Sequence, residues 1–193
     1  GCHLLTLIND ILDLSKIEAR KMEIHPKESH LPSLLQGVAE ICRVRADQKG
    51  VEFVYQVDEA LPEGVIVDEK RLRQVLINLL GNAVKFTRKG RITFSVSVVE
   101  KGARSQTEGQ GTQEAATNRP ADTLQFLIED TGVGMTAEQR ERIFLPFEQV
   151  GNQSTHAEGT GLGLAISHQI LEKMGGPLKV KSQVGIGSTF WFD

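Results

Sequence analysis

"NLLGNAVKFT", residues 78–87, is the stretch of the chain that says most about its fold. The surrounding residues have the spacing of an amphipathic helix. Asn78, Asn82 and Lys85 are spaced i, i+4 and i+7, so at 100° per residue they fall within about 60° of one another. Three aligned polar groups beside a buried face predict either a solvated flank or a binding surface. The buried face would consist of Leu72, Val75, Leu76, Leu79, Leu80 and Ala83.

The segments around this helix mix helices with strands. Asp68 is placed as its N-cap after a short strand, and an earlier helix over residues 34–48 would end at Gly50. A short helix would begin at Thr136, with Gln139 completing a capping box. Strand alternation is found at residues 51–57, 91–99, 124–130, 178–182 and 188–192. Because the later strands follow one another by hairpins, we expect an α+β fold with a mixed or antiparallel sheet covered by helices.

The first residues have a helical pattern of their own. Leu4, Leu7, Ile11 and Leu14 follow heptad spacing, which predicts a helix that needs an apolar partner. That partner is either this domain or a helical bundle between two chains. Residues 23–32 are interpreted as a connector. No capping residue precedes the helix, so we expect a longer parent protein.

Composition excludes several classes. The chain has 193 residues, 39% hydrophobic content and a formal charge of −3, which fits a globular domain and disfavours nucleic acid and anionic lipid. Cys2 and Cys42 do not form a disulfide or zinc pattern, and no signal segment or bilayer-length apolar run is present. The polar spacer over residues 100–122 is interpreted as a loop in a hairpin with no role in chemistry.

Two glycine-rich segments suit a nucleotide. "GTGLGL", residues 159–164, runs into a helix whose N-terminal N–H groups attract phosphate. The amide oxygen of Asn82 could bind Mg²⁺, and Lys85 could contact phosphate oxygens. In "DTGVGM", residues 130–135, Asp130 could accept a hydrogen bond from an exocyclic amine of a base, with Gly132 and Gly134 allowing close approach. The P-loop, dinucleotide and Ser/Thr or Tyr kinase signatures are all absent.

The order of five motifs resembles that of sensor histidine kinases, in the superfamily shared with type II topoisomerase ATPase domains. The motifs are "NLLGNAVKFT", "DTGVGM", "FLPFEQ", "GTGLGL" and "GIGSTFWF", and the last is most similar to hybrid kinases. The resemblance implies a two-layer α/β sandwich of the Bergerat (GHKL) type. The stretch "LINDILDLSKIEARKME" resembles the second helix of that family's dimerisation and phosphoacceptor domain. The resemblance therefore implies that residues 1–24 are the end of that domain and that residues 25–193 are the catalytic ATP-binding domain.

The resemblance also assigns roles. Asn82 would coordinate Mg²⁺, Asn78 would support it, and Lys85 would touch phosphate. Asp130 would bind the adenine amine. Phe144 and Phe147 would anchor a mobile lid over residues 148–158, unless both belong to the core, and Gly185 with Gly187 would either finish the adenine side or only form a turn. The remaining nucleotide-binding residues would be Gly132, Gly134, Phe147, Gly159, Thr160, Gly161, Leu162, Gly163 and Ser188.

One family motif is missing. A phosphoacceptor segment like H-E-[LI]-R-T-P does not occur in residues 1–193, and His156 and His168 are interpreted as lid and helix-surface residues. The resemblance therefore implies an ATP- and Mg²⁺-dependent protein histidine kinase, in a cytoplasmic domain, whose acceptor histidine lies on another segment. Its partners would be that segment, a response regulator or receiver domain, and a second copy in a homodimer, with no nucleic acid. The alternatives are a catalytically silent nucleotide-binding module, a dimerisation module and, least favoured, a pure ATPase.

Overall fold

A five-stranded mixed sheet forms one layer of the protein, for which a computed structural model describes residues 2–99, 123–148 and 160–193. The strand order is β2-β4-β5-β7-β6, with β2 parallel to β4 and the other pairs antiparallel. This confirms the predicted α+β class with a mixed sheet. The strands are β2 (Glu52–Val57), β4 (Arg91–Val99), β5 (Thr123–Asp130), β6 (Lys179–Gln183) and β7 (Gly187–Phe192).

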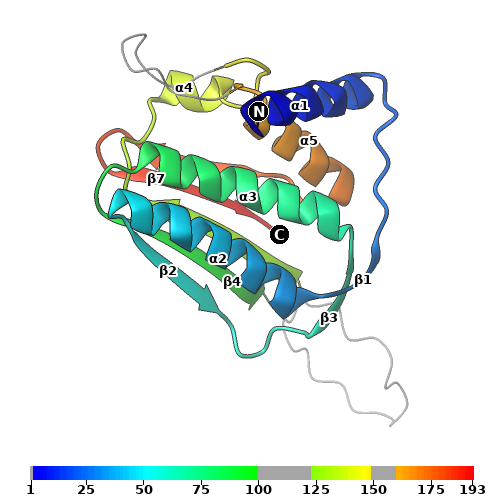
Figure 1. The fold of residues 1–193 in the computed structure, drawn as a ribbon, viewed down its shortest axis with the longest axis horizontal. Helices are drawn as coiled ribbons and strands as arrows, with labels where there is room; N and C mark the ends of the chain where they lie inside the picture. Colours follow the sequence, from blue (N-terminus) through cyan, green and yellow to red (C-terminus); the bar gives the residue numbers. More distant parts are fainter. Residues whose placement is uncertain (1, 100–122, 149–159) are drawn as a thin grey trace, which may run out of the picture.

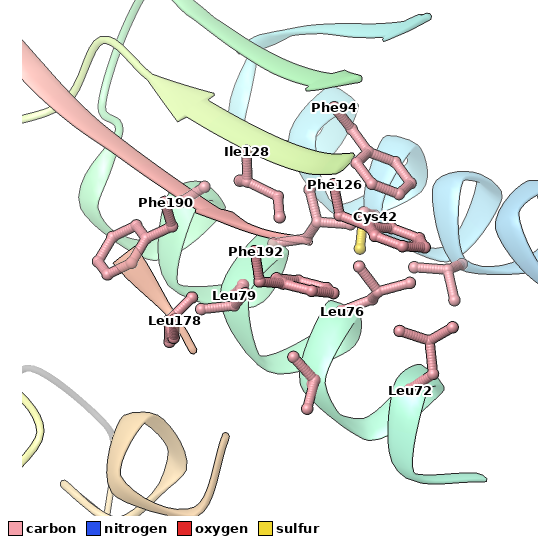
Figure 2. Packing of buried hydrophobic residues seen from close by; sticks show 14 of the residues in the cluster. Cys42, Leu72, Leu76, Leu79, Phe94, Phe126, Ile128, Leu178, Phe190 and Phe192 are labelled. Atoms are coloured by element: carbon pink, nitrogen blue, oxygen red, sulfur yellow. The ribbon is translucent and has the colours of Figure 1, made fainter. Parts of the chain in front are cut away.

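Helices form the second layer. In Figure 1, α2 (Leu31–Lys49) and α3 (Glu69–Phe86) lie across the sheet, and α5 (Gly163–Met174) lies on the other side of α3 from α2. In Figure 2, Leu76 and Leu79 of α3 point toward Phe126 and Phe192 of the sheet. The rings of these two phenylalanines stack with centroids 4.8 Å apart. The predicted buried face of α3 is confirmed, because each of its six apolar residues is at most 4% exposed.

The predicted helix boundaries around α3 are largely confirmed. Asp68 caps α3 by accepting a hydrogen bond from the Arg71 N–H at 3.1 Å, and Gly50 ends α2 in the left-handed conformation. The capping box of Thr136 and Gln139 begins α4 (Ala137–Arg142). The hairpin across the spacer is also confirmed, since β4 and β5 pair in antiparallel register up to Val99 and Thr123. The spacer itself, residues 100–122, lies outside the described residues.

The interpretation of residues 23–32 as a connector was wrong. They contain β1 (Lys27–His30), which pairs antiparallel with β3 (Gly64–Val67), and α2 begins at Leu31 instead of about Leu34. His30 is the N-cap, and its ring nitrogen accepts a hydrogen bond from the Ser33 N–H at 3.3 Å. Pro32 follows in the first turn, where its missing N–H costs nothing.

The first helix, α1 (Cys2–Glu18), packs on this domain through part of its apolar stripe. Leu14 and Ile17 contact the main core, whereas Ile8, Ile11 and Leu12 are 43–52% exposed. Figure 1 shows α1 beside α5. Between α1 and β1, Met22 is buried in the same core. None of the helices in the described part of the chain has the length and apolar character needed to cross a membrane.

Candidate functional site

The predicted polar stripe of α3 meets the start of α5 at Asn78. Its amide nitrogen donates to the Ser167 hydroxyl at 2.8 Å, and Ser167 is 1% exposed. Its amide oxygen faces Gly163, where an added Cβ would stand 2.1 Å from it. Only glycine therefore allows α5 to begin so close to α3. Asn78 fixes the position of the glycine loop, and Ser167 is a partner that the sequence did not reveal.

Asn82 and Lys85 continue the stripe toward the C-terminal end of α3, and both are half-buried. Asn82 makes no hydrogen bond with any residue that the structure describes, so its amide is available to a ligand. Lys85 extends its ammonium to 4.9 Å from the centroid of the Phe86 ring. The helix end is closed by Lys49, whose ammonium donates to the carbonyls of Val84 and Lys85 at 2.7 and 3.0 Å.

Asp130 forms the second part of the candidate site, at the end of β5. It is 7% exposed and accepts a hydrogen bond from the Gly132 N–H at 2.8 Å. Burial raises the pKa of Asp130, while the N–H groups of Gly132 and Ser188 oppose that shift. A buried carboxylate that accepts only two backbone N–H groups keeps lone pairs for a further donor, such as the amine of a base.

Glycines let the backbone close around Asp130. A Cβ on Gly132 would stand 2.7 Å from both the Asp130 carboxylate and the Phe86 carbonyl, so this loop lies against the end of α3. A Cβ on Gly187 would stand 1.9 Å from the Asp130 carbonyl. Gly187 therefore packs against the loop as well as ending the β6–β7 turn. Gly134 has a φ of 65° and would clash with the Gln183 carbonyl in the same way.

Ser188 joins the site through a second serine that sequence reasoning missed. The hydroxyls of Ser182 and Ser188 lie 3.0 Å apart, and Ser182 also accepts from the Met135 N–H and donates to the Gly187 carbonyl. Because Ser182 has a single proton, the Ser188 hydroxyl is the donor between them. The lone pairs of Ser188 remain open as acceptors at this end of the site.

The two ends of the expected lid lie together. Phe147 has a φ of 65° and is 66% exposed, and its N–H donates to the Gly161 carbonyl at 3.0 Å. Phe147 is therefore not a core residue, whereas Phe144 packs against the core and stacks on the His168 ring with centroids 4.7 Å apart. His168, expected on the helix surface, has a side chain that is only 25% exposed. The rest of the expected lid, residues 149–158 with His156, lies outside the described residues, and so does Gly159.

Thr160 and Leu162 set the local form of the glycine loop. The Thr160 hydroxyl accepts a hydrogen bond from the Leu162 N–H at 3.1 Å and donates one to Asp10 of α1 at 3.2 Å. The Leu162 side chain is buried in the core at 2% exposure, and the Leu162 carbonyl accepts a hydrogen bond from the Ile166 N–H at 2.9 Å, so Leu162 shapes the loop. Gly161 has a φ of 71°, which favours glycine at the turn into α5.

The arrangement brings the two predicted glycine segments to α3. The N-terminal end of α5 meets it at Asn78, and the Asp130 loop meets it at Phe86. Two other grooves lie beside the start of α3: one of about 430 Å³ against α1, and one of about 870 Å³ against residues 21–29. Neither groove is lined by a predicted site residue, so the candidate site is built on another part of α3. Among the described residues, no three His, Cys, Asp or Glu side chains gather as a metal cluster.

Comparisons with known proteins identify relatives of the chain. Residues 67–193 match the family model described as histidine kinase-, DNA gyrase B- and HSP90-like ATPase. The chain is 39% identical over 192 residues to the virulence sensor protein BvgS of Bordetella bronchiseptica, covering 98% of the chain and 14% of BvgS. It is 37% identical over 191 residues to the signal transduction histidine-protein kinase BarA of Escherichia coli, covering 98% of the chain and 19% of BarA.

Solved structures of histidine kinases also match the chain. Full-length ShkA, crystallised in complex with AMPPNP, matches 98% of the chain and 35% of its own length at 35% identity and a TM-score of 0.77. The catalytic domain of the histidine kinase ThkA matches 89% of the chain and 96% of its own length at 25% identity and a TM-score of 0.62. The chain thus spans less than a fifth of the curated relatives given above.

Proposed function

The chain belongs to the family of histidine kinase-, DNA gyrase B- and HSP90-like ATPases, and we propose that it is the catalytic ATP-binding domain of a hybrid sensor histidine kinase. It transfers the γ-phosphoryl group of ATP to a histidine on a segment outside residues 1–193. One observation carries the proposal: α3 holds both glycine segments, one at Asn78 and the other at Phe86. A nucleotide lying along the polar stripe of α3 would therefore have a base site at one end and a phosphate site at the other.

The phosphate end is assigned to α3 and α5. The amide oxygen of Asn82 suits Mg²⁺, which often takes only one or two protein ligands and completes its shell with phosphate and water. When bound, Mg²⁺ supplies positive charge that neutralises the phosphates. The fit rests on the half-buried Asn82 amide, which has no partner among the described residues. Lys85 adds a point charge, and the backbone of residues 160–163 faces the phosphates at the N-terminus of α5.

The base end is assigned to Asp130. Its carboxylate accepts the exocyclic amine of adenine, and Gly132 and Gly134 let the loop beside it pack closely on Phe86 and Gln183. Ser188 offers an acceptor on the same side. A guanine presents a carbonyl where adenine presents the amine, and the Asp130 carboxylate cannot donate to it. The site therefore prefers adenine.

The chemistry needs positioning more than covalent help. Phosphoryl transfer passes through a transition state with charge spread over the phosphoryl oxygens, so in-line placement and charge neutralisation are what the residues supply. Asn78 is an amide, and both of its ends face other groups, Ser167 and Gly163. It cannot take a proton from water as a carboxylate could. We therefore expect slow hydrolysis, so that the phosphoryl group is kept for the imidazole nucleophile.

The surrounding segments complete the proposal. The lid is anchored at Phe144 and Phe147 and closes through Gly159 and Gly161 over the triphosphate. The histidine domain of the parent, a response regulator or receiver domain, and a second copy of the chain are the proposed partners, in a cytoplasmic setting. These assignments are supported by the relatives BvgS, a virulence sensor protein, and BarA, a signal transduction histidine-protein kinase.

Binding of a fluorescent ATP analogue, with and without Mg²⁺, tests this proposal. Asp130→Asn should abolish binding in both conditions, since it removes the acceptor of the adenine amine. Asn82→Ala should lose only the part of the affinity that depends on Mg²⁺. Asp47→Asn is a matched control, because Asp47 is exposed on α2. The proposed site is wrong if Asp130→Asn and Asn82→Ala both bind as the wild type does.

A further inference from the structure

The helix α1 contacts the proposed phosphate loop through a charged residue. The Thr160 hydroxyl donates to the Asp10 carboxylate at 3.2 Å, across 150 positions of sequence. Thr160 is the residue before Gly161, where the loop turns into α5. The Asp10 carboxylate thus accepts the proton of a hydroxyl that lies at the proposed triphosphate site.

Asp10 lies on the face of α1 that packs against the rest of the domain. Residues 10, 13, 14 and 17 are spaced i, i+3, i+4 and i+7, which places them on one side of α1. Asp13 accepts hydrogen bonds from Arg71 at 3.0 Å and Gln74 at 2.8 Å, and the side chains of Asp13 and Arg71 are only 14% and 13% exposed. Leu14 and Ile17 pack on the core. The position of Asp10 is therefore set by three neighbours on the same face.

No cationic side chain among the described residues pairs with the Asp10 carboxylate. Arg71 donates to Asp13 and Gln74, and within the described residues Asp10 accepts a hydrogen bond from Thr160 alone. The single proton of the Thr160 hydroxyl goes to Asp10 and is not available to a phosphate oxygen. A terminal phosphate at this loop would also face the Asp10 carboxylate in a partly desolvated site, where like charges repel.

We propose that Asp10 discriminates between ATP and ADP: docking of α1 and binding of the terminal phosphate compete for Thr160, so ATP releases α1 and ADP leaves it docked. This inference rests on the proposed function. By linkage, the competition is reciprocal, so docking weakens ATP binding by the same factor that ATP weakens docking. Docking of α1 would then report which nucleotide is bound.

Nucleotide affinities of the whole chain test the discrimination. Asp10→Asn keeps the shape and can still accept the Thr160 proton, but it removes the charge. ATP affinity should rise by about fivefold or more, the lower end of typical coupling between sites, while ADP affinity changes by less than about twofold. Asp47→Asn makes the same change of charge on the exposed face of α2 and should alter neither affinity.

The outcomes distinguish failure of the role given to Asp10 from failure of the proposed function. An unchanged ratio of ATP to ADP affinity in Asp10→Asn overturns the role of Asp10 and leaves the proposed function standing. If neither nucleotide binds to the wild type or to Asp10→Asn, both the proposed function and this inference fail.

Hydrogen exchange gives a second readout. A non-hydrolysable ATP analogue should speed amide exchange in residues 2–18 of the wild type, and ADP should not. In Asp10→Asn the difference between the two nucleotides should shrink. Equal exchange of this helix with both nucleotides in the wild type would overturn the proposal.

Discussion

Substitution of Gly163 tests how the candidate site is assembled. An added Cβ would stand 2.1 Å from the Asn78 amide oxygen and 2.8 Å from its Cγ, so the side chain or the helix must move by about 1 Å or more. Asn78 can turn away only by giving up its hydrogen bond to Ser167, which leaves the buried Ser167 hydroxyl without this partner. That loss costs about 1–3 kcal/mol. Gly163 is the first residue of α5, so alanine there regains at most about 0.5 kcal/mol, the lower end of its gain over glycine in the middle of a helix. The expected net loss for Gly163→Ala is about 0.5–3 kcal/mol.

Gly81 provides the matched control. It lies within α3, and an added Cβ there would meet nothing within 4 Å, so Gly81→Ala should stabilise the protein by about 0.5–1 kcal/mol. Urea unfolding measures both variants, with slopes of about 1–3 kcal/mol per molar. In an Asn78→Ala background, Gly163→Ala should no longer destabilise, because the clashing amide is gone. The reasoning fails if Gly163→Ala is as stable as the wild type, or if its cost is the same in both backgrounds.

Three further predictions concern Asn78, Asp130 and Cys42. Asn78→Glu should raise ATP hydrolysis in a phosphate-release assay, since a carboxylate can take a proton from water; an unchanged rate in a folded variant counts against the role given to the amide. In the nucleotide-free protein, the carboxyl carbon of Asp130 should titrate by NMR above the ordinary range of aspartate, and a normal midpoint would contradict its burial. Because the pKa of Asp130 is raised in the folded protein, its buried charge lowers the free energy of unfolding fully above that raised pKa. This loss is relieved as the pH falls toward the ordinary pKa of aspartate. Burial raises the pKa of the Cys42 thiol to about 11, so alkylation at Cys42, followed by mass spectrometry, should be no faster than unfolding at pH 8, and rapid modification would refute this.

Local signals in the sequence were sufficient for much of the fold. The caps at Asp68, Gly50 and Thr136 depend on residues within four positions of one another, and the structure has all three. The apolar period of α3 identified its buried face for the same reason. β1 escaped prediction because only Ser29 of its four residues is buried, so its sequence lacks the alternation of a half-buried strand. Its pairing with β3 is a long-range contact.

The partners of the site residues could not be predicted in this way. Ser167 and Ser182 are single serines within ordinary helix and strand patterns, and no local feature marks them as partners of Asn78 and Ser188. The contact between Asp10 and Thr160 joins residues 150 positions apart. The resemblance located the glycine segments, but the close approach of Gly163 to Asn78 depends on how two helices cross. Such contacts are decided by tertiary packing.

A crystal structure of the chain with Mg²⁺ and a non-hydrolysable ATP analogue tests the central claim most directly. We expect Mg²⁺ on the amide oxygen of Asn82, the adenine amine on the carboxylate of Asp130, and phosphates at the N-terminus of α5. Density for the nucleotide in another place, or side chains packed across the space between these residues, would contradict it.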